Sequence, residues 1–144
     1  MEAKPTLADM MEAYARDAAD HAKASAGVTL DFSPESIQGV EKVLEKAYAE
    51  MPRGLGRLFR KGPSPEVMDS MCKMYGGYIG EVVRRTGGGE WVIDREVAPG
   101  QEVLSLRKGD SVVFPPAKVH KRLTNGPEDN VWFYFQVLMQ QHWK

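Results

Sequence analysis

Apolar residues recur at every third or fourth position along three long stretches of the chain, which is the spacing of one helix face. Thr6 or Asp9 could cap the first stretch, and Gly27 should end it. In the second and third stretches a serine is followed directly by proline, the usual order of an N-cap and first helical residue. The pattern therefore predicts three helices, over residues 6–27, 33–52 and 64–89.

The apolar period changes to two at Glu90, which is typical of β-strands. Trp91, Ile93 and Val97 are expected on one face of the first strand. Pro99-Gly100 suits the centre of a type II turn, and Lys108-Gly109-Asp110 suits a hairpin turn. Tight turns between short strands predict an antiparallel meander with strands at residues 90–97, 102–107 and 111–114.

Two C-terminal segments, residues 116–124 and 131–139, favour helix, although a strand stays possible for both. Asp129 or Asn130 could cap the last one. Its side chains are apolar almost all round, so we expect it to be largely buried. The predicted fold is α+β in a single domain of residues 1–144. Helices occupy about 6–86, and a three-stranded antiparallel meander with C-terminal helices packed on it occupies about 90–141.

Composition narrows the class of protein. The chain has 144 residues, 42% hydrophobic and 27% charged, as in an ordinary globular domain. Its net charge of −1 gives no overall attraction to nucleic acid or an anionic membrane. Cys72 is the only cysteine, which excludes an internal disulfide and a cysteine zinc cluster. The N-terminus lacks the apolar segment of a signal peptide, and no apolar run is long enough to span a membrane. We therefore expect a cytoplasmic protein without a membrane partner.

Three glycines, Gly76, Gly77 and Gly80, fall inside the third predicted helix. Each glycine in a helix interior costs about 1 kcal/mol relative to alanine. We interpret them as a strip that another chain segment approaches closely; a ligand at the strip and a break in the helix are the alternatives. Glu81 adjoins the strip and could pair with Arg85 four residues on. If it is buried, its candidate partners are Arg84, His120, Lys121 and Arg122.

A basic cluster lies in the segment that follows Pro115-Pro116. It is interpreted either as a solvated helix face or as a site for an anion or an acidic protein surface. An enzymatic alternative uses Glu81 or His120 as acid or base, with the cations as an anion clamp. The cluster comprises Lys118, His120, Lys121 and Arg122.

A second basic segment, residues 52–64, is punctuated by glycine and proline. We expect a surface loop with Leu55, Leu58 and Phe59 turned inward. The alternative is a basic binding loop. Nucleic-acid binding would require its cations to share one continuous face with the cluster around Lys121; they are Arg53, Arg57, Arg60 and Lys61.

The sequence contains no motif for metal binding, nucleophilic catalysis or nucleotide binding. His21, His120 and His142 are widely separated and lack metal-ligand spacing, so no metal site is expected. No nucleophile elbow, phosphate loop or dinucleotide motif occurs, and no cofactor is predicted.

The segments G-G-Y-I-G-E-V-V-R-R, G-G-E-W-V and F-P-P-A-K-V-H-K-R-L-T-N-G-P-E-D-N together resemble a family of small bacterial domains of unknown function. The resemblance covers about residues 66–140. It implies an α+β domain and carries no assigned chemistry. The matching positions are Gly76, Tyr78, Gly80, Glu81, Trp91, Lys121 and Arg122.

The functional prediction is a small cytosolic bacterial binding protein without catalytic activity. An immunity or antitoxin protein that docks to one protein partner is the narrower hypothesis. The alternative is a hydrolase or transferase acting on an anionic small molecule. The candidate binding residues are Tyr78, Glu81, Trp91, Lys118, Lys121 and Arg122.

Overall fold

The computed structural model describes residues 4–144, and the three helices predicted in its first part are present. They are α1 (Leu7–Ala26), α2 (Ile37–Glu50) and α3 (Pro65–Gly87). Thr6 caps α1 in a reciprocal capping box with Asp9, and Gly27 ends it in the left-handed conformation at φ 66°. A short 3-10 turn, η1 (Pro34–Ser36), precedes α2.

The three strands form the predicted antiparallel meander, β1 (Glu90–Asp94), β2 (Val103–Lys108) and β3 (Ser111–Val113), in the order β1-β2-β3. Trp91 pairs with Leu106 across β1 and β2. The turn at Pro99-Gly100 is also as predicted, because Gly100 has φ 83° and the N–H of Gln101 donates to the carbonyl of Ala98 at 3.0 Å. The fold class is therefore α+β.

The prediction that Val97 shares a face with Trp91 is wrong. Strand β1 ends at Asp94, and Val97 is 58% exposed. Oδ1 of Asp94 accepts from the backbone N–H groups of Glu96 and Val97, both at 2.9 Å. This side-chain bonding turns the chain before the alternation can continue.

The C-terminal segments are helices, which excludes the strand alternative for both. Helix α4 spans Pro115–Asn125, a 3-10 turn η3 spans Pro127–Asp129, and α5 spans Val131–Val137 before continuing into a π-helical turn, η4 (Leu138–His142). The side chain of Asn130 caps α5 by accepting from the N–H of Phe133 at 2.9 Å.

The expectation that the last helix is largely buried fails at Phe133, which is 67% exposed. Val131, Phe135 and Leu138 lie on the inward side at helical spacing and are buried. Phe133 is about 200° around the helix from Val131, so its side chain points outward.

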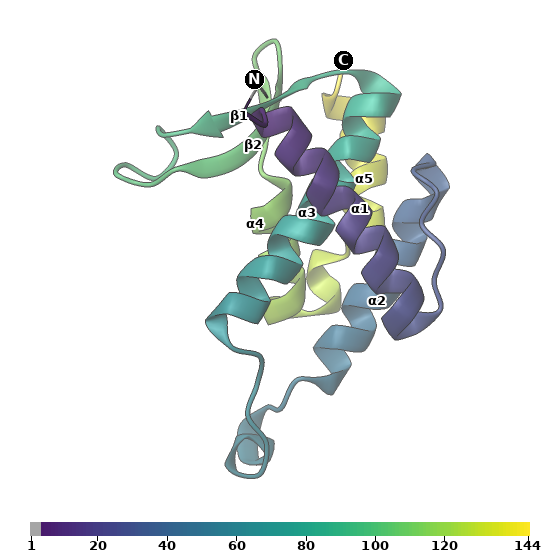
Figure 1. The fold of residues 1–144 in the computed structure, drawn as a ribbon, viewed down its shortest axis with the longest axis vertical. Helices are drawn as coiled ribbons and strands as arrows, with labels where there is room; N and C mark the ends of the chain where they lie inside the picture. The colour runs from purple at the N-terminus through teal and green to yellow at the C-terminus, as the bar shows by residue number, and fades with distance from the viewer. Residues whose placement is uncertain (1–3) are drawn as a thin grey trace.

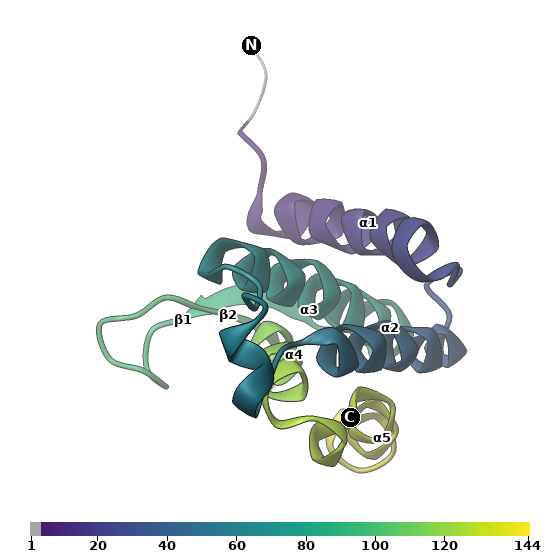
Figure 2. The same ribbon diagram turned by 90° about the horizontal axis from the view of Figure 1, so that it is seen from below.

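Helix α3 lies at the centre of the molecule, between α1 on one side and α4 on the other (Figures 1 and 2). Helix α5 packs against α2 on the side away from α1 (Figure 2). The sheet projects from one end of this helical stack (Figure 1). One hydrophobic cluster runs through these layers, from Met11 in α1 to Trp143 near the C-terminus.

The glycine strip of α3 is approached by three different chain segments, and the helix is unbroken. A Cβ at Gly76 would lie 2.4 Å from the Cα of Pro116 in α4, and one at Gly77 would lie 3.2 Å from the backbone oxygen of Met11 in α1. At Gly80 it would lie 2.1 Å from the indole of Trp91. The predicted close approach is therefore confirmed.

The loop between α2 and α3 differs from its prediction. Leu55, Leu58 and Phe59 were expected inside, but they are 78%, 75% and 84% exposed. A 3-10 turn, η2 (Gly54–Leu58), reverses the chain beyond the ends of α2 and α3 (Figure 1), out of reach of the core. None of the helices described in residues 4–144 combines the length and the apolar character needed to cross a bilayer.

Candidate functional site

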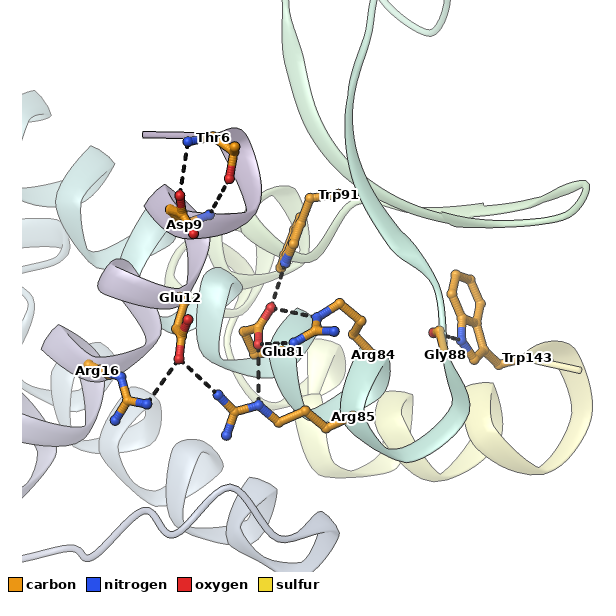
Figure 3. Close-up of polar contacts among 10 residues, drawn as sticks. All are labelled: Thr6, Asp9, Glu12, Arg16, Glu81, Arg84, Arg85, Gly88, Trp91 and Trp143. Carbon is orange, nitrogen blue, oxygen red and sulfur yellow. Dashed lines mark hydrogen bonds and ion pairs between the residues drawn. The ribbon is translucent and has the colours of Figure 1, made fainter. Parts of the chain in front are cut away.

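Glu81 forms the densest polar network that we find around the glycine strip, and its side chain is only 1% exposed (Figure 3). Arg84 donates to both carboxylate oxygens at 2.9 Å. The indole Nε1 of Trp91 donates to Oε1 at 2.8 Å, and Nε of Arg85 donates to Oε2 at 3.3 Å. The missing side chain at Gly80 leaves the space in which the Trp91 ring reaches the carboxylate.

Arg85 extends this network to α1 (Figure 3). Its Nη2 lies 3.4 Å from Oε1 of Glu12, which also pairs with Arg16 at 2.9 Å. The Arg85 guanidinium also lies over the ring of Phe32, 4.0 Å from its centroid. Helix α3 is thus connected by polar contacts to α1, to β1 and to the link before α2.

The Glu81 carboxylate is fully occupied as a hydrogen-bond acceptor. Each oxygen accepts two bonds, which fills its lone-pair sites. Burial opposes ionisation, but the bonds from Arg84 and Trp91 and the charges of Arg84 and Arg85 outweigh it, so the pKa of Glu81 lies below its ordinary value. A cavity of about 420 Å³ borders the group. The carboxylate is a structural ion-pair partner, with no acceptor site left for a substrate proton.

Tyr78 is equally occupied. Its side chain is fully buried; its hydroxyl accepts from the N–H of Phe32 at 2.8 Å and bonds to Oγ of Ser36 at 2.6 Å. Burial raises the pKa of Tyr78. Phe32 has a left-handed backbone at φ 65°, so Tyr78 holds an unusual turn in place.

The basic cluster of α4 is divided between the core and the surface. Arg122 is fully buried, and its Nε and Nη2 donate to Glu41 of α2 at 2.7–3.1 Å. Nη2 also donates to Glu45. Among the described residues, Nη1 of Arg122 has no partner. Lys118 is half-buried and pairs with Asp129 at 3.0 Å.

His120 and Lys121 lie exposed on α4. Four partners were predicted for a buried Glu81, namely Arg84, His120, Lys121 and Arg122, and of these only Arg84 bonds to it. Arg85, predicted as its partner four residues on, bonds to it as well. Glu81 borders a cavity beside α1 and β1 that His120 does not line. The two candidate acid-base residues of the enzymatic alternative therefore do not share that cavity.

A groove of about 490 Å³ lies between β3 and α5, and sequence reasoning missed it. Lys118 and Asn130 line its polar part. Helical spacing alone could have indicated it, because Phe133 falls opposite the buried face of its helix. The apolar lining includes Val112, Val113, Phe133, Tyr134, Val137 and Leu138.

Comparison of the chain with family models, curated proteins and solved structures found no match. The resemblance to a family of small bacterial domains therefore stays a prediction. Within this fold, Gly76, Gly80, Glu81, Trp91 and Arg122 serve packing and internal ion pairing. These motif positions describe how the fold is built.

Proposed function

We propose that this protein is a non-catalytic binding protein that docks one protein partner in the groove between β3 and α5. The observation that carries the proposal is the apolar groove of about 490 Å³ with Phe133, 67% exposed, on its wall. A large exposed aromatic beside an apolar depression is the usual composition of a protein-binding anchor.

The groove also offers backbone hydrogen-bonding groups. Strand β3 is an edge strand, and Lys108 pairs with Ser111 across the two-residue hairpin loop. That pair is hydrogen-bonded, so at the next residue, Val112, the N–H and C=O point away from β2. An extended segment of the partner would bond to Val112 and place its apolar side chains in the groove.

The remaining polar features support binding over catalysis. Glu81 is saturated by Arg84, Arg85 and Trp91, and Arg122 is neutralised by two glutamates. An immunity or antitoxin protein acts by such docking to a single partner, and we propose this class, acting in the cytosol.

The test begins with capture of the partner from cells that express this protein, followed by binding measurements with the purified pair. Phe133→Glu should weaken binding about tenfold or more, since a charge replaces a central apolar anchor. Val112→Pro should also weaken it, because proline removes the outward N–H while an edge position tolerates the ring.

Two variants serve as controls. Val97→Glu places the same charge at an exposed apolar residue away from the groove, and Val112→Thr keeps the N–H. Both should bind as the wild type does. Equal binding by Phe133→Glu and wild type, with unchanged circular dichroism, overturns the groove as the docking site.

A further inference from the structure

The loop between α2 and α3 gathers positive charge without any compensating acid. Residues 52–64 contain Arg53, Arg57, Arg60 and Lys61 and no aspartate or glutamate. All four side chains are exposed. The chain as a whole has a net charge of −1, so this cluster is a local excess that the total conceals.

These four cations line a single cavity of about 470 Å³. Its other walls come from the end of α2, from Met68 of α3 and from Leu123 and Thr124 of α4, and no carboxylate side chain lines it. A cavity walled by three guanidinium groups and an ammonium group suits a phosphate or another multivalent oxyanion.

The body of the protein holds two of the cations in place. Nη1 of Arg53 donates to the carbonyl of Tyr48 at 3.2 Å, and its guanidinium lies 4.1 Å from the centroid of the Tyr48 ring. Nη2 of Arg60 donates to the carbonyl of Glu50 at 3.0 Å. Each contact uses a single donor of the guanidinium, so donors remain for a ligand.

None of the four cations forms an ion pair with a carboxylate of residues 4–144. The other arginines of the chain all do: Arg16, Arg84, Arg85, Arg95, Arg107 and Arg122. The loop is therefore the place where arginine charge is left available for an external anion.

The same loop carries the three most exposed large apolar side chains of the described chain, Leu55, Leu58 and Phe59. They lie on and directly after η2, which projects at the end of the long axis opposite the sheet and the C-terminus (Figure 1). A site for a free anion has no need of such side chains, whereas a contact with the interface of a lipid bilayer buries them.

We propose that this tip docks on an anionic membrane surface, with a phospholipid headgroup phosphate in the cavity and the three apolar side chains in the interface. The charge complements an anionic leaflet, and a bilayer accepts a narrow projecting tip. A stable protein interface needs about 800 Å² from each partner, spread over roughly 20–30 residues. The tip residues 53–61 offer far fewer, so a membrane fits this surface better than a second protein.

The test is co-sedimentation of the full chain with vesicles. The wild type should bind vesicles that contain phosphatidylglycerol and should not bind vesicles of phosphatidylcholine alone. Arg57→Gln and Lys61→Gln should each lower the partition coefficient about fivefold. Leu58→Gln with Phe59→Gln should lower it about tenfold or more at unchanged charge.

Matched controls separate the tip from general surface effects. Lys121→Gln removes an exposed cation that does not line the cavity, and Val97→Gln replaces an exposed valine elsewhere. Both should partition as the wild type does, and all variants are checked by circular dichroism.

Three results would overturn the proposal. One is the absence of binding to anionic vesicles. Another is binding that the Leu58 and Phe59 substitutions leave unchanged while inorganic phosphate competes fully, which assigns the cavity to a free anion. The last is tighter binding of the full chain, through the tip cations, to duplex DNA than to vesicles, with both measured at the same salt concentration.

Discussion

Two arginine-containing regions of this protein behave in opposite ways. In α4, Arg122 is fully buried and is paired with Glu41 and Glu45 of α2. In the loop before α3, Arg53, Arg57 and Arg60 are exposed and pair with no carboxylate of residues 4–144. Both regions are basic clusters in the sequence, and the packing of α2 against α4 separates their roles.

The role of a basic cluster therefore depends on which carboxylates the fold places beside it. Helix α2 presents Glu41 and Glu45 one turn apart, and both reach Arg122. The loop extends past the end of α2, where no acid follows Glu50 until Glu66. The buried pairing of Arg122 serves stability, and the loop cations, unpaired within residues 4–144, carry the binding proposal.

The largest expected change in unfolding free energy comes from removing the buried arginine, Arg122. Arg122→Ala leaves Glu41 partly buried without its cation and empties a fully buried volume, so it should lower the free energy of unfolding by about 3–5 kcal/mol. Urea denaturation measures it. Arg95→Ala is the control, because that residue and Glu102 are each 65% exposed; it should cost at most about 1 kcal/mol. Equal losses in the two variants would mean that burial of Arg122 adds nothing to the stability of its ion pairs.

The next effect concerns the contact that positions Trp91 over Glu81. Gly80→Ala places a methyl group where the Trp91 ring lies, so the ring must move away from the carboxylate. We expect a loss of about 1–3 kcal/mol in unfolding free energy and a changed tryptophan fluorescence spectrum. Gly56→Ala in the exposed tip meets only Pro52, at 3.9 Å, and should leave both nearly unchanged. An unshifted spectrum in Gly80→Ala would contradict the arrangement.

A smaller effect is the acid sensitivity of the internal network. The pKa of Glu81 is lower in the folded chain, so its ionised form stabilises the fold above the ordinary carboxyl pKa of about 4.3. This stabilisation is lost as the pH falls through the lower folded pKa. Unfolding free energies at a series of acidic pH values should fall less steeply for Glu81→Gln than for wild type. Parallel curves would mean that Glu81 does not contribute in this way.

The smallest expected change in stability concerns the exposed cations of the loop before α3. Arg57→Gln and Lys61→Gln remove cations without an ion pair in residues 4–144, so each should change the unfolding free energy by less than about 0.5 kcal/mol. Thermal and urea denaturation measure this. A loss as large as that of Arg122→Ala would show that the loop charges hold the fold together, and would remove their availability for a ligand.

Much of the fold follows from local signals in the sequence. Thr6, Ser64 and Asn130 each cap the helix predicted for them, because a cap satisfies N–H groups only three residues away. Ser33, predicted to cap the second helix, instead caps the 3-10 turn η1 that precedes α2. The turns at Gly100 and Gly109 follow from the positive φ of single glycines. The glycine strip of α3 likewise predicts a close approach.

The sequence draws attention to four residues of the interior network but predicts a different role for them. The candidate binding residues Tyr78, Glu81, Trp91 and Arg122 are each buried and bonded within the fold. Their partners lie up to 81 residues away along the chain, as for Arg122 and Glu41. No local pattern specifies such a pairing.

Local patterns in the sequence predict the three N-terminal helices, the meander and the close contact at Gly76–Gly80, because these depend on neighbours within a few residues. The same patterns leave helix and strand open for the two C-terminal segments, which the folded chain forms as helices. Tertiary structure alone decided which charges are neutralised and which apolar side chains stay outside. Burial depends on where whole elements lie: η2 projects beyond the core with Leu58 and Phe59 exposed, while α2 carries two glutamates to Arg122.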